Sequence, residues 1–227
     1  MKRKLKILLV DDHPLILEAY VNILKSIEQS ESNFSLTIDT ANDCDSAIQL
    51  IDQAAKNQAY DMLFTDVKLP PSKEGAIISG EDLGIYMKQK IPTARVVILT
   101  MINENYRIHN ILSNVNPDGF LIKNDVTSKE FQIAFEKILD DPPYYSSTVS
   151  KFFRKRTLIR SESSLDTINR KILFYLSQGV KTKDLCKYIN LSQSAIEKRK
   201  NQIKNVFELE KSNDEELLKV AEERGYI

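Results

Sequence analysis

The chain has 227 residues, of which 42% are hydrophobic, and it carries 32 basic and 32 acidic side chains. This length and composition suit two globular domains of ordinary size. The apolar part of the N-terminal MKRKLKILLV is only about five residues long, against the roughly 7–15 of a secretory signal, and no apolar stretch approaches the ~20 residues of a membrane span. The two cysteines, Cys44 and Cys186, lack CxxC spacing, so we expect buried or half-buried thiols and neither a disulfide nor a zinc site. We therefore predict a soluble cytoplasmic protein without membrane association.

The charges are unevenly distributed along the chain. Residues 1–150 carry 15 Lys and Arg against 21 Asp and Glu, whereas residues 151–227 carry 17 against 11. A basic C-terminal part indicates a polyanionic partner.

The first 140 residues alternate between short apolar runs and amphipathic stretches. The first helix is expected to begin at Pro14, with Tyr20, Leu24 and Ile27 at helical spacing. The other helices are expected at 43–57, 82–90, 104–114 and 127–139, and the strands at 5–10, 35–40, 60–65, 95–101 and 119–123. Five strands alternating with five helices predict an α/β fold, a parallel sheet covered on both faces and joined by right-handed crossovers.

The pattern changes at Pro142-Pro143, because proline cannot continue a helix. We therefore divide the chain into an N-terminal domain at 1–141, a polar and basic linker at 142–164 and a small all-α domain at 165–227. The linker has room for a short helix around 146–156.

Strongly polar residues follow four of the five predicted strands. Asp11-Asp12, Asp66, Thr100 and Lys123 stand at the carboxyl ends of strands one, three, four and five, the edge where open parallel sheets bind ligands. Three carboxylates drawn together repel one another, and a bound cation relieves this; oxygen ligands with room for water suit Mg²⁺.

These side chains also predict a reaction. The single carboxylate Asp66 is placed to attack phosphorus, with Mg²⁺, Thr100 and Lys123 neutralising the oxygens of the transferring group. The alternative for each residue alone is a solvated strand end. His13 has no second histidine nearby, and we do not expect it to bind metal.

Residues 1–140 resemble the receiver domain of two-component response regulators, which implies a flavodoxin-like, doubly wound, five-stranded parallel sheet. The resemblance is carried by VDDHP at 10–14, FTDVKLP at 64–70, LT at 99–100 and GFLIK at 119–123.

The resemblance assigns a role to each motif residue. It implies that Asp12 binds Mg²⁺ directly and Asp11 through water, with Asp66 and the backbone carbonyl of Lys68 as further ligands. Asp66 would accept phosphate from the phosphohistidine of a sensor histidine kinase, and Thr100 and Lys123 would hold it. Phe120 occupies the aromatic switch position, where the ring turns inward as the threonine shifts.

Three features depart from the receiver pattern. Met101 follows Thr100 where a small side chain is usual, so access to Asp66 is expected to be narrower. Lys68 lies two residues beyond the nucleophile, a position that tunes dephosphorylation in this family. The stretch 71–81 is longer than usual; a lid or a partner contact is possible, but we favour a tolerated surface insertion.

The C-terminal part has the pattern of a helix-turn-helix. A helix at about 182–189, with Leu185, Cys186 and Ile189 inward, meets a turn at Asn190-Leu191, and Ser192 can cap a second helix. That helix has an apolar face (Ile196, Ile203, Phe207) and a polar face suited to a DNA major groove (Glu197, Lys198, Asn201, Lys204, Asn205). Periodicity alone also fits a solvated basic face on a helical bundle.

Residues 165–209 resemble the LuxR/NarL-type DNA-binding domain, through LSQG at 176–179, KDLCKYINLS at 183–192 and AIEKRKNQIKNVFEL at 195–209. The resemblance implies base reading by Glu197, Lys198 and Asn201, although a lysine is common at the first of these positions. The complete set of expected DNA contacts is Lys183, Ser194, Glu197, Lys198, Arg199, Lys200, Asn201 and Lys204.

The tail 212–227 is expected to form an extra C-terminal helix, capped by Ser212 or Asn213 and packed on the domain through Leu217, Leu218 and Ala221; a dimer contact is the alternative.

The sequence therefore predicts a transcriptional response regulator, not an enzyme, that binds double-stranded DNA and forms a homodimer when phosphorylated or DNA-bound. One alternative is a regulator that acts through protein contacts without DNA. The other is an aspartate-nucleophile phosphatase, which is disfavoured because Lys68 stands where such an enzyme has its acid-base carboxylate.

Overall fold

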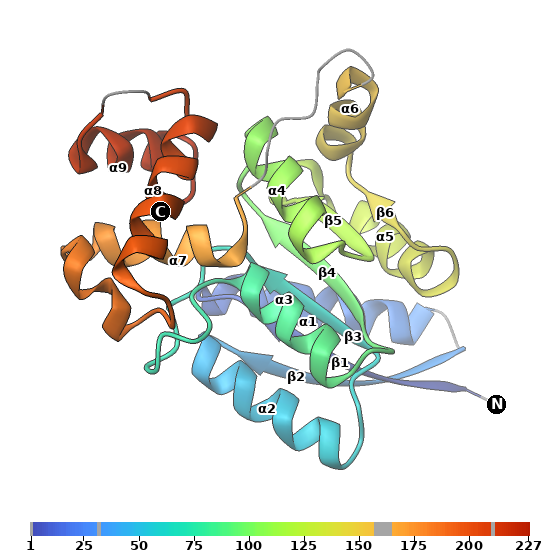
Figure 1. The fold of residues 1–227 in the computed structure, drawn as a ribbon. Helices are drawn as coiled ribbons and strands as arrows, with labels where there is room; N and C mark the ends of the chain where they lie inside the picture. The colour runs from blue at the N-terminus through green and yellow to red at the C-terminus, as the bar shows by residue number, and fades with distance from the viewer. Residues whose placement is uncertain (1, 31–32, 157–164, 210–211) are drawn as a thin grey trace. The chain divides into compact units, whose positions relative to one another are not determined.

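The computed structural model describes residues 2–30, 33–156, 165–209 and 212–227. They form two compact units, one of Met1–Asn103 with Val115–Arg154 and one of Glu104–Asn114 with Lys155–Ile227 (Figure 1). Within the described ranges, no helix combines the length and hydropathy needed to cross a membrane.

The first unit is built on a parallel sheet with strand order β2-β1-β3-β4-β5-β6. Its strands are β1 (Arg3–Val10), β2 (Phe34–Ala41), β3 (Met62–Asp66), β4 (Arg95–Thr100), β5 (Gly119–Ile122) and β6 (Tyr144–Tyr145). Strands β3, β4 and β5 are almost wholly buried, as expected for a sheet with helices on both faces. The prediction of a doubly wound parallel sheet is confirmed.

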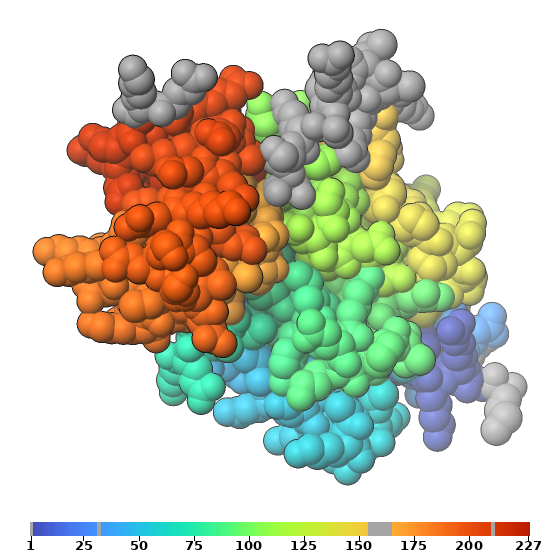
Figure 2. All heavy atoms as spheres, viewed as in Figure 1, coloured from blue at the N-terminus to red at the C-terminus, as the bar shows by residue number. Residues whose placement is uncertain are grey.

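Helices α1 (Pro14–Ser30) and α5 (Ser128–Asp140) pack on one face of this sheet, where they share a core with the strands. Phe131 of α5 lies between Tyr20 and Phe64, with ring centroids 4.9 and 5.2 Å away. Helices α2 (Cys44–Lys56) and α3 (Gly80–Lys90) lie side by side on the other face (Figures 1 and 2). All four begin within two residues of the sequence-based expectation.

The predicted boundary at residue 141 is too early. Residues 144–154, which we expected in a linker, belong to the first unit as strand β6 and helix α6 (Ser147–Arg156). The sequence contains no recognisable strand pattern for β6, because this strand is two residues long and directly follows Pro142-Pro143. The rest of the predicted linker, residues 157–164, lies outside the described residues.

The second unit contains helices α4 (Asn105–Val115, through residue 114), α7 (Thr167–Ser177), α8 (Gln193–Val206) and α9 (Asp214–Glu223). A core that includes Leu173, Ile196 and Leu217 joins α7, α8 and α9. Asn213 caps α9 by accepting from the Glu216 amide, so the predicted tail helix is an integral part of this core. Within the unit, the Asn114 side-chain amide also donates to the Leu165 carbonyl (2.9 Å).

The segment predicted as a helix at 182–189 is a 3₁₀ helix, η2 (Thr182–Lys187). A 3₁₀ turn advances each side chain by about 120°, so adjacent residues do not share a face as closely as in an α-helix. Leu185 and Ile189 are buried as expected, but Cys186 is exposed and its predicted inward position is wrong. Cys44 is buried.

Candidate functional site: a phosphoacceptor edge and a helix-turn-helix face

The sheet brings the predicted strand-end residues to one edge. In the register of the sheet, Asp66 pairs with Leu99 and Thr100 with Ile122, so the residues at the carboxyl ends of β1, β3, β4 and β5 converge there. Asp11, Asp66 and Thr100 are 2%, 6% and 0% exposed. Two carboxylates and a hydroxyl are thus held at the rim of a hydrophobic core.

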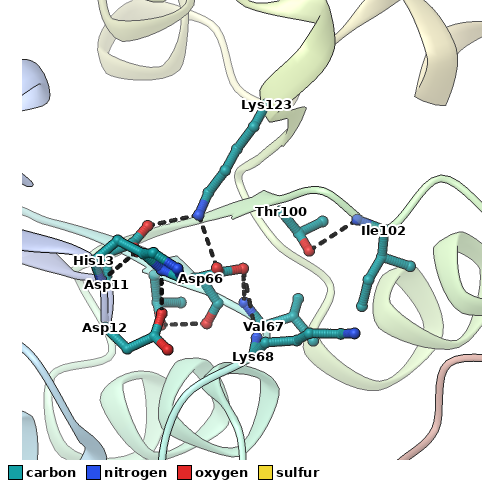
Figure 3. Close-up of polar contacts among 10 residues, drawn as sticks. Asp11, Asp12, His13, Asp66, Val67, Lys68, Thr100, Ile102 and Lys123 are labelled. Carbon is teal, nitrogen blue, oxygen red and sulfur yellow. Dashed lines mark hydrogen bonds and ion pairs between the residues drawn. The ribbon is translucent and has the colours of Figure 1, made fainter. Parts of the chain in front are cut away.

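The Lys123 ammonium joins two of these carboxylates. It donates to Asp11 Oδ2 at 2.6 Å and to Asp66 Oδ2 at 2.7 Å, and its side chain is only 8% exposed (Figure 3). Charges at low exposure are weakly screened, so loss of any one of these three groups would leave an uncompensated charge in a buried setting. The structure therefore confirms that Asp11, Asp66 and Lys123 meet.

The protonation equilibria of these groups are coupled. Burial raises the pKa of Asp66, and the Lys123 ammonium opposes that rise. Burial by itself would lower the pKa of Lys123, but hydrogen bonds to Asp11 and Asp66 raise it above its ordinary value. A second cation near Asp66 would further favour the charged carboxylate that a nucleophile must be.

The backbone around Asp66 is tightly constrained. Asp66 Oδ1 accepts the Val67 N–H at 2.6 Å, and the Gly80 N–H donates to the Val67 carbonyl at 3.0 Å. A Cβ on Gly80 would lie 1.6 Å from the Asp66 carbonyl oxygen, so only glycine allows α3 to begin this close to the end of β3. Gly80 supports the site, and we did not single it out from the sequence.

The acidic corner offers oxygen ligands for a cation. Ligand atoms of Asp11, Asp12 and His13 lie within 4.8 Å of one another, and His13 Nδ1 is 2.6 Å from Asp12 Oδ1. Asp12 is exposed, whereas the adjoining Asp11 and Asp66 are buried, so the corner opens to solvent on one side. Buried and open carboxylates together fit a hard cation that keeps bound water, as Mg²⁺ does.

The remaining receiver residues lie around this corner. The Thr100 hydroxyl accepts the Ile102 N–H at 3.2 Å, and the Phe120 ring is fully buried. The Lys68 side chain is exposed and points away from Lys123 (Figure 3), and its backbone N–H faces Asp66 Oδ1 at 3.4 Å. Met101 is 54% exposed.

Tyr20 on α1 is a further residue near this charge cluster that the sequence suggested only as part of a helix face. Burial raises its pKa to about 12, and the charges of Lys123, Asp11 and Asp66 all act on it. Helical spacing in the sequence indicates which face of α1 is buried. It does not indicate that the Tyr20 hydroxyl lies near the charged residues at the strand ends.

The predicted DNA-binding residues fall into two groups. Ser192 caps α8 as expected, accepting the Ala195 N–H. The first group is exposed and lies on α8 and on the preceding η2. Its members are Lys183, Ser194, Glu197, Lys198 and Asn201. Glu197 Oε1 accepts from the Gln193 side chain at 3.2 Å. This surface is polar and carries both donors and acceptors.

The other three predicted DNA contacts are used inside the unit. Lys200 is 9% exposed and donates to Thr182 Oγ1 at 2.7 Å and to Asp214. Arg199 bonds Asp166 at 2.6 Å, and the Lys204 ammonium donates to the Ser212 carbonyl. In this structure the three side chains tie α8 to its neighbours, and Lys200 alone among them is buried. Their contacts with DNA phosphates stay a prediction.

The sequence carried a signal for this difference. Lys200 lies four residues after Ile196 and three before Ile203, on the apolar face of α8, where a lysine must find partners inside the fold. Residues 197, 198 and 201 lie on the opposite face.

Comparisons with known proteins agree with this arrangement. Residues 7–132, more than half of the chain, match the response regulator receiver domain family. The transcriptional regulatory protein MctR of Rhizobium johnstonii is 22% identical over 201 residues, which is 88% of this chain and 86% of MctR. RcsB of Escherichia coli K12 is 24% identical over 197 residues, which is 86% and 85% of the two chains.

Solved structures extend the likeness over both units. RcsB of Salmonella enterica serovar Typhimurium, bound to promoter rprA with the phosphomimetic BeF₃⁻, matches with a TM-score of 0.66 at 21% identity and covers 96% of this chain and 98% of its own. A second RcsB structure from Salmonella typhimurium also gives 0.66, at 22% identity and 99% coverage of both chains. With a receiver fold, a paired Asp66 and Lys123 and a helical C-terminal unit, the chain belongs to the response regulator family.

Proposed function

We propose that the chain is a cytoplasmic transcriptional response regulator that accepts a phosphoryl group on Asp66 from a sensor histidine kinase and binds double-stranded DNA through α8. The observation that carries the proposal is the buried Lys123 ammonium held between Asp11 and Asp66. This arrangement orients one carboxylate and provides a cation beside it, which a carboxylate nucleophile for phosphorus requires.

In the proposed transfer, a carboxylate oxygen of Asp66 forms a bond to phosphorus while the P–N bond of the donor phosphohistidine breaks. The electron pair of that bond stays on the imidazole nitrogen, which takes a proton from solvent. Asp11, Asp12, Asp66 and the Lys68 carbonyl are the proposed ligands of Mg²⁺, which supplies neutralisation of phosphoryl oxygens when bound. Lys123 and the Thr100 hydroxyl hold the transferred group. Phe120 occupies the aromatic switch position, and its ring changes conformation as Thr100 shifts toward that group.

For DNA binding, we assign base contacts to Glu197, Lys198 and Asn201 and backbone contacts to Lys183 and Ser194. A short helix that presents donors and acceptors on one exposed face suits the major groove, where each base pair has a distinct pattern. Solved RcsB structures include one bound to a promoter and one described as two RcsB dimers bound to two parallel DNAs. By that likeness we propose a homodimer on DNA.

The other two functions receive less support. An aspartate-nucleophile phosphatase needs an acid-base group two residues beyond its nucleophile, and Lys68 there is a cation whose side chain is exposed. A regulator that binds only other proteins would not need the exposed hydrogen-bond donors and acceptors on α8 that we assign to base contacts.

Selection of bound sequences from random duplex DNA tests the proposal, with the full chain in the presence and absence of a small phosphoryl donor and Mg²⁺. We expect a preferred sequence whose affinity rises on phosphorylation and falls steeply with salt. Asp66→Asn should keep the preference and lose the response to the donor. No affinity for any duplex in either state would refute DNA binding and favour a protein partner.

A further inference from the structure

The segment that leads out of the first unit is docked on the sheet. Strand β6 pairs with β5, and the Tyr144 and Ser146 amides each donate at 3.0 Å, to the carbonyls of Asp118 and Phe120 respectively. Ser146 is 5% exposed, and Val149 of α6 is fully buried. Tyr144, Tyr145 and Ser146 are therefore held along the strand that carries Phe120.

Asp125 holds the beginning of α6. Its carboxylate accepts the Thr148 N–H at 2.7 Å, the Thr148 hydroxyl at 2.9 Å and the Ser146 hydroxyl at 2.8 Å. Ser146 Oγ in turn accepts the Ile122 N–H at 3.1 Å. Although burial would raise the pKa of Asp125, these hydrogen bonds and the charge of Lys151 lower it, so the carboxylate stays charged.

The same short turn reaches the phosphorylation site. Asp125 is the last residue of the 3₁₀ helix η1 (Lys123–Asp125), of which Lys123 is the first, and the Val126 N–H closes the turn on the Lys123 carbonyl at 3.3 Å. One end of η1 thus bonds Asp11 and Asp66, and the other end bonds the first turn of α6. Only Asn124 separates the two residues within this turn, so a shift of the Lys123 backbone moves Asp125 as well.

We propose that Asp125 is a positioning residue that couples the phosphorylation state of Asp66 to the docking of α6, the last helix of the first unit. The inference rests on the proposed function, because it needs a phosphoryl group at Asp66. That group draws the Lys123 ammonium away from Asp11 toward the new phosphoryl oxygens. The shift of η1 loosens the bonds from Asp125 to Ser146 and Thr148 and releases the start of α6.

Amide hydrogen exchange of the full chain tests the coupling, with beryllofluoride and Mg²⁺ as the probe that mimics the phosphoryl group. In the wild-type protein, peptides covering 144–153 should exchange several-fold faster with the probe, while peptides covering Asp66 become protected. In Asp125→Ala, the peptides covering 144–153 should exchange about tenfold faster without the probe, because the carboxylate no longer stabilises the first turn of α6, as a helix-capping side chain does. Adding the probe should not increase their exchange further.

Two variants separate positioning from general destabilisation. Asp125→Asn should stay near wild type and keep the response, because the amide oxygen can accept the Thr148 N–H and the amide N–H can donate to the Thr148 hydroxyl. Asp43→Ala is the matched control: it removes a carboxylate that caps α2 through Ser46, at 2.7 Å, and should leave both the exchange of 144–153 and its response unchanged.

The outcomes are distinguishable. Protection at Asp66 with no change in 144–153 would overturn the coupling and leave the proposed function intact. Absence of protection at Asp66 would overturn the proposed function and the coupling with it. If Asp125→Ala does not fold, Thr148→Val carries the test, since it removes the hydroxyl bond to Asp125 and keeps the backbone bond. Equal exchange of 144–153 in this variant and wild type would then refute the coupling.

Discussion

Two lysines two residues apart on α8 should behave in opposite ways, because one faces solvent and the other is bonded inside the unit. Lys198 is exposed, whereas the Lys200 side chain is 11% exposed and its ammonium lies 2.7 Å from both Thr182 Oγ1 and Asp214. We compare Lys198→Met with Lys200→Met, which remove the same charge and keep most of the same stem.

The structure sets the expected magnitude for Lys200. A hydrogen bond to a charged group contributes about 1.5–3 kcal/mol. The Asp214 side chain is 45% exposed and regains water when its partner is lost, so we expect a loss of about 1–2 kcal/mol in the free energy of unfolding of the C-terminal unit. For a unit of this size, each kcal/mol lowers the melting temperature by about 4–8 °C. Lys198→Met should change the unfolding free energy by less than about 0.5 kcal/mol.

Binding should show the reverse order. Lys198→Met should weaken binding to the preferred duplex by about 1–3 kcal/mol, as expected for the loss of a base contact. Lys200→Met should leave that affinity unchanged at temperatures where it is folded. Calorimetry and titrations of duplex binding on the full chain provide both measurements. A weakened affinity in Lys200→Met, with stability unaltered, would refute the assignment of Lys200 to the interior.

Three further predictions concern single residues. Gly80→Ala should destabilise the first unit by about 2–3 kcal/mol, because its Cβ would overlap the Asp66 carbonyl oxygen; an unchanged unfolding midpoint would contradict the close approach. Met101→Ala should leave stability within about 0.5 kcal/mol and shorten the half-life of the aspartyl phosphate several-fold, measured by loss of label; an unchanged or longer half-life would show that this half-exposed side chain does not restrict water. Glu197→Ala should relax selectivity at one base pair by about 1–3 kcal/mol in competition binding, whereas an identical selected sequence would exclude it from base reading.

The phosphoacceptor edge could be predicted from the sequence for a topological reason. The carboxyl ends of parallel strands meet at one edge whatever the connecting segments do, so the polar residues after four apolar runs had to converge. Asp11, Asp66 and Lys123 meet there, within hydrogen-bonding distance. The sequence did not show which of these side chains form hydrogen bonds with one another, because that depends on the length and conformation of each side chain at the sheet edge.

The end of the first unit and the internal lysine were harder to predict, for different reasons. Strand β6 has two residues, too few for a periodic signal, and it is held by pairing with β5, a strand more than 20 residues earlier in the chain. Lys200 was assigned by its charge, while its position between Ile196 and Ile203 pointed to the interior. In that case, helical periodicity carried more structural information than residue type.

The most direct test of the account is the site of phosphorylation. The full chain is incubated with Mg²⁺ and a small phosphoryl donor, and the modified residue is located by mass spectrometry after reductive trapping of the acyl phosphate. The account predicts modification of Asp66 in the wild type and none in Asp66→Asn, while Asp61→Asn, which changes an exposed carboxylate just before the other end of β3, should be modified like wild type. Undiminished modification of Asp66→Asn, or modification mapped to another residue, would contradict it.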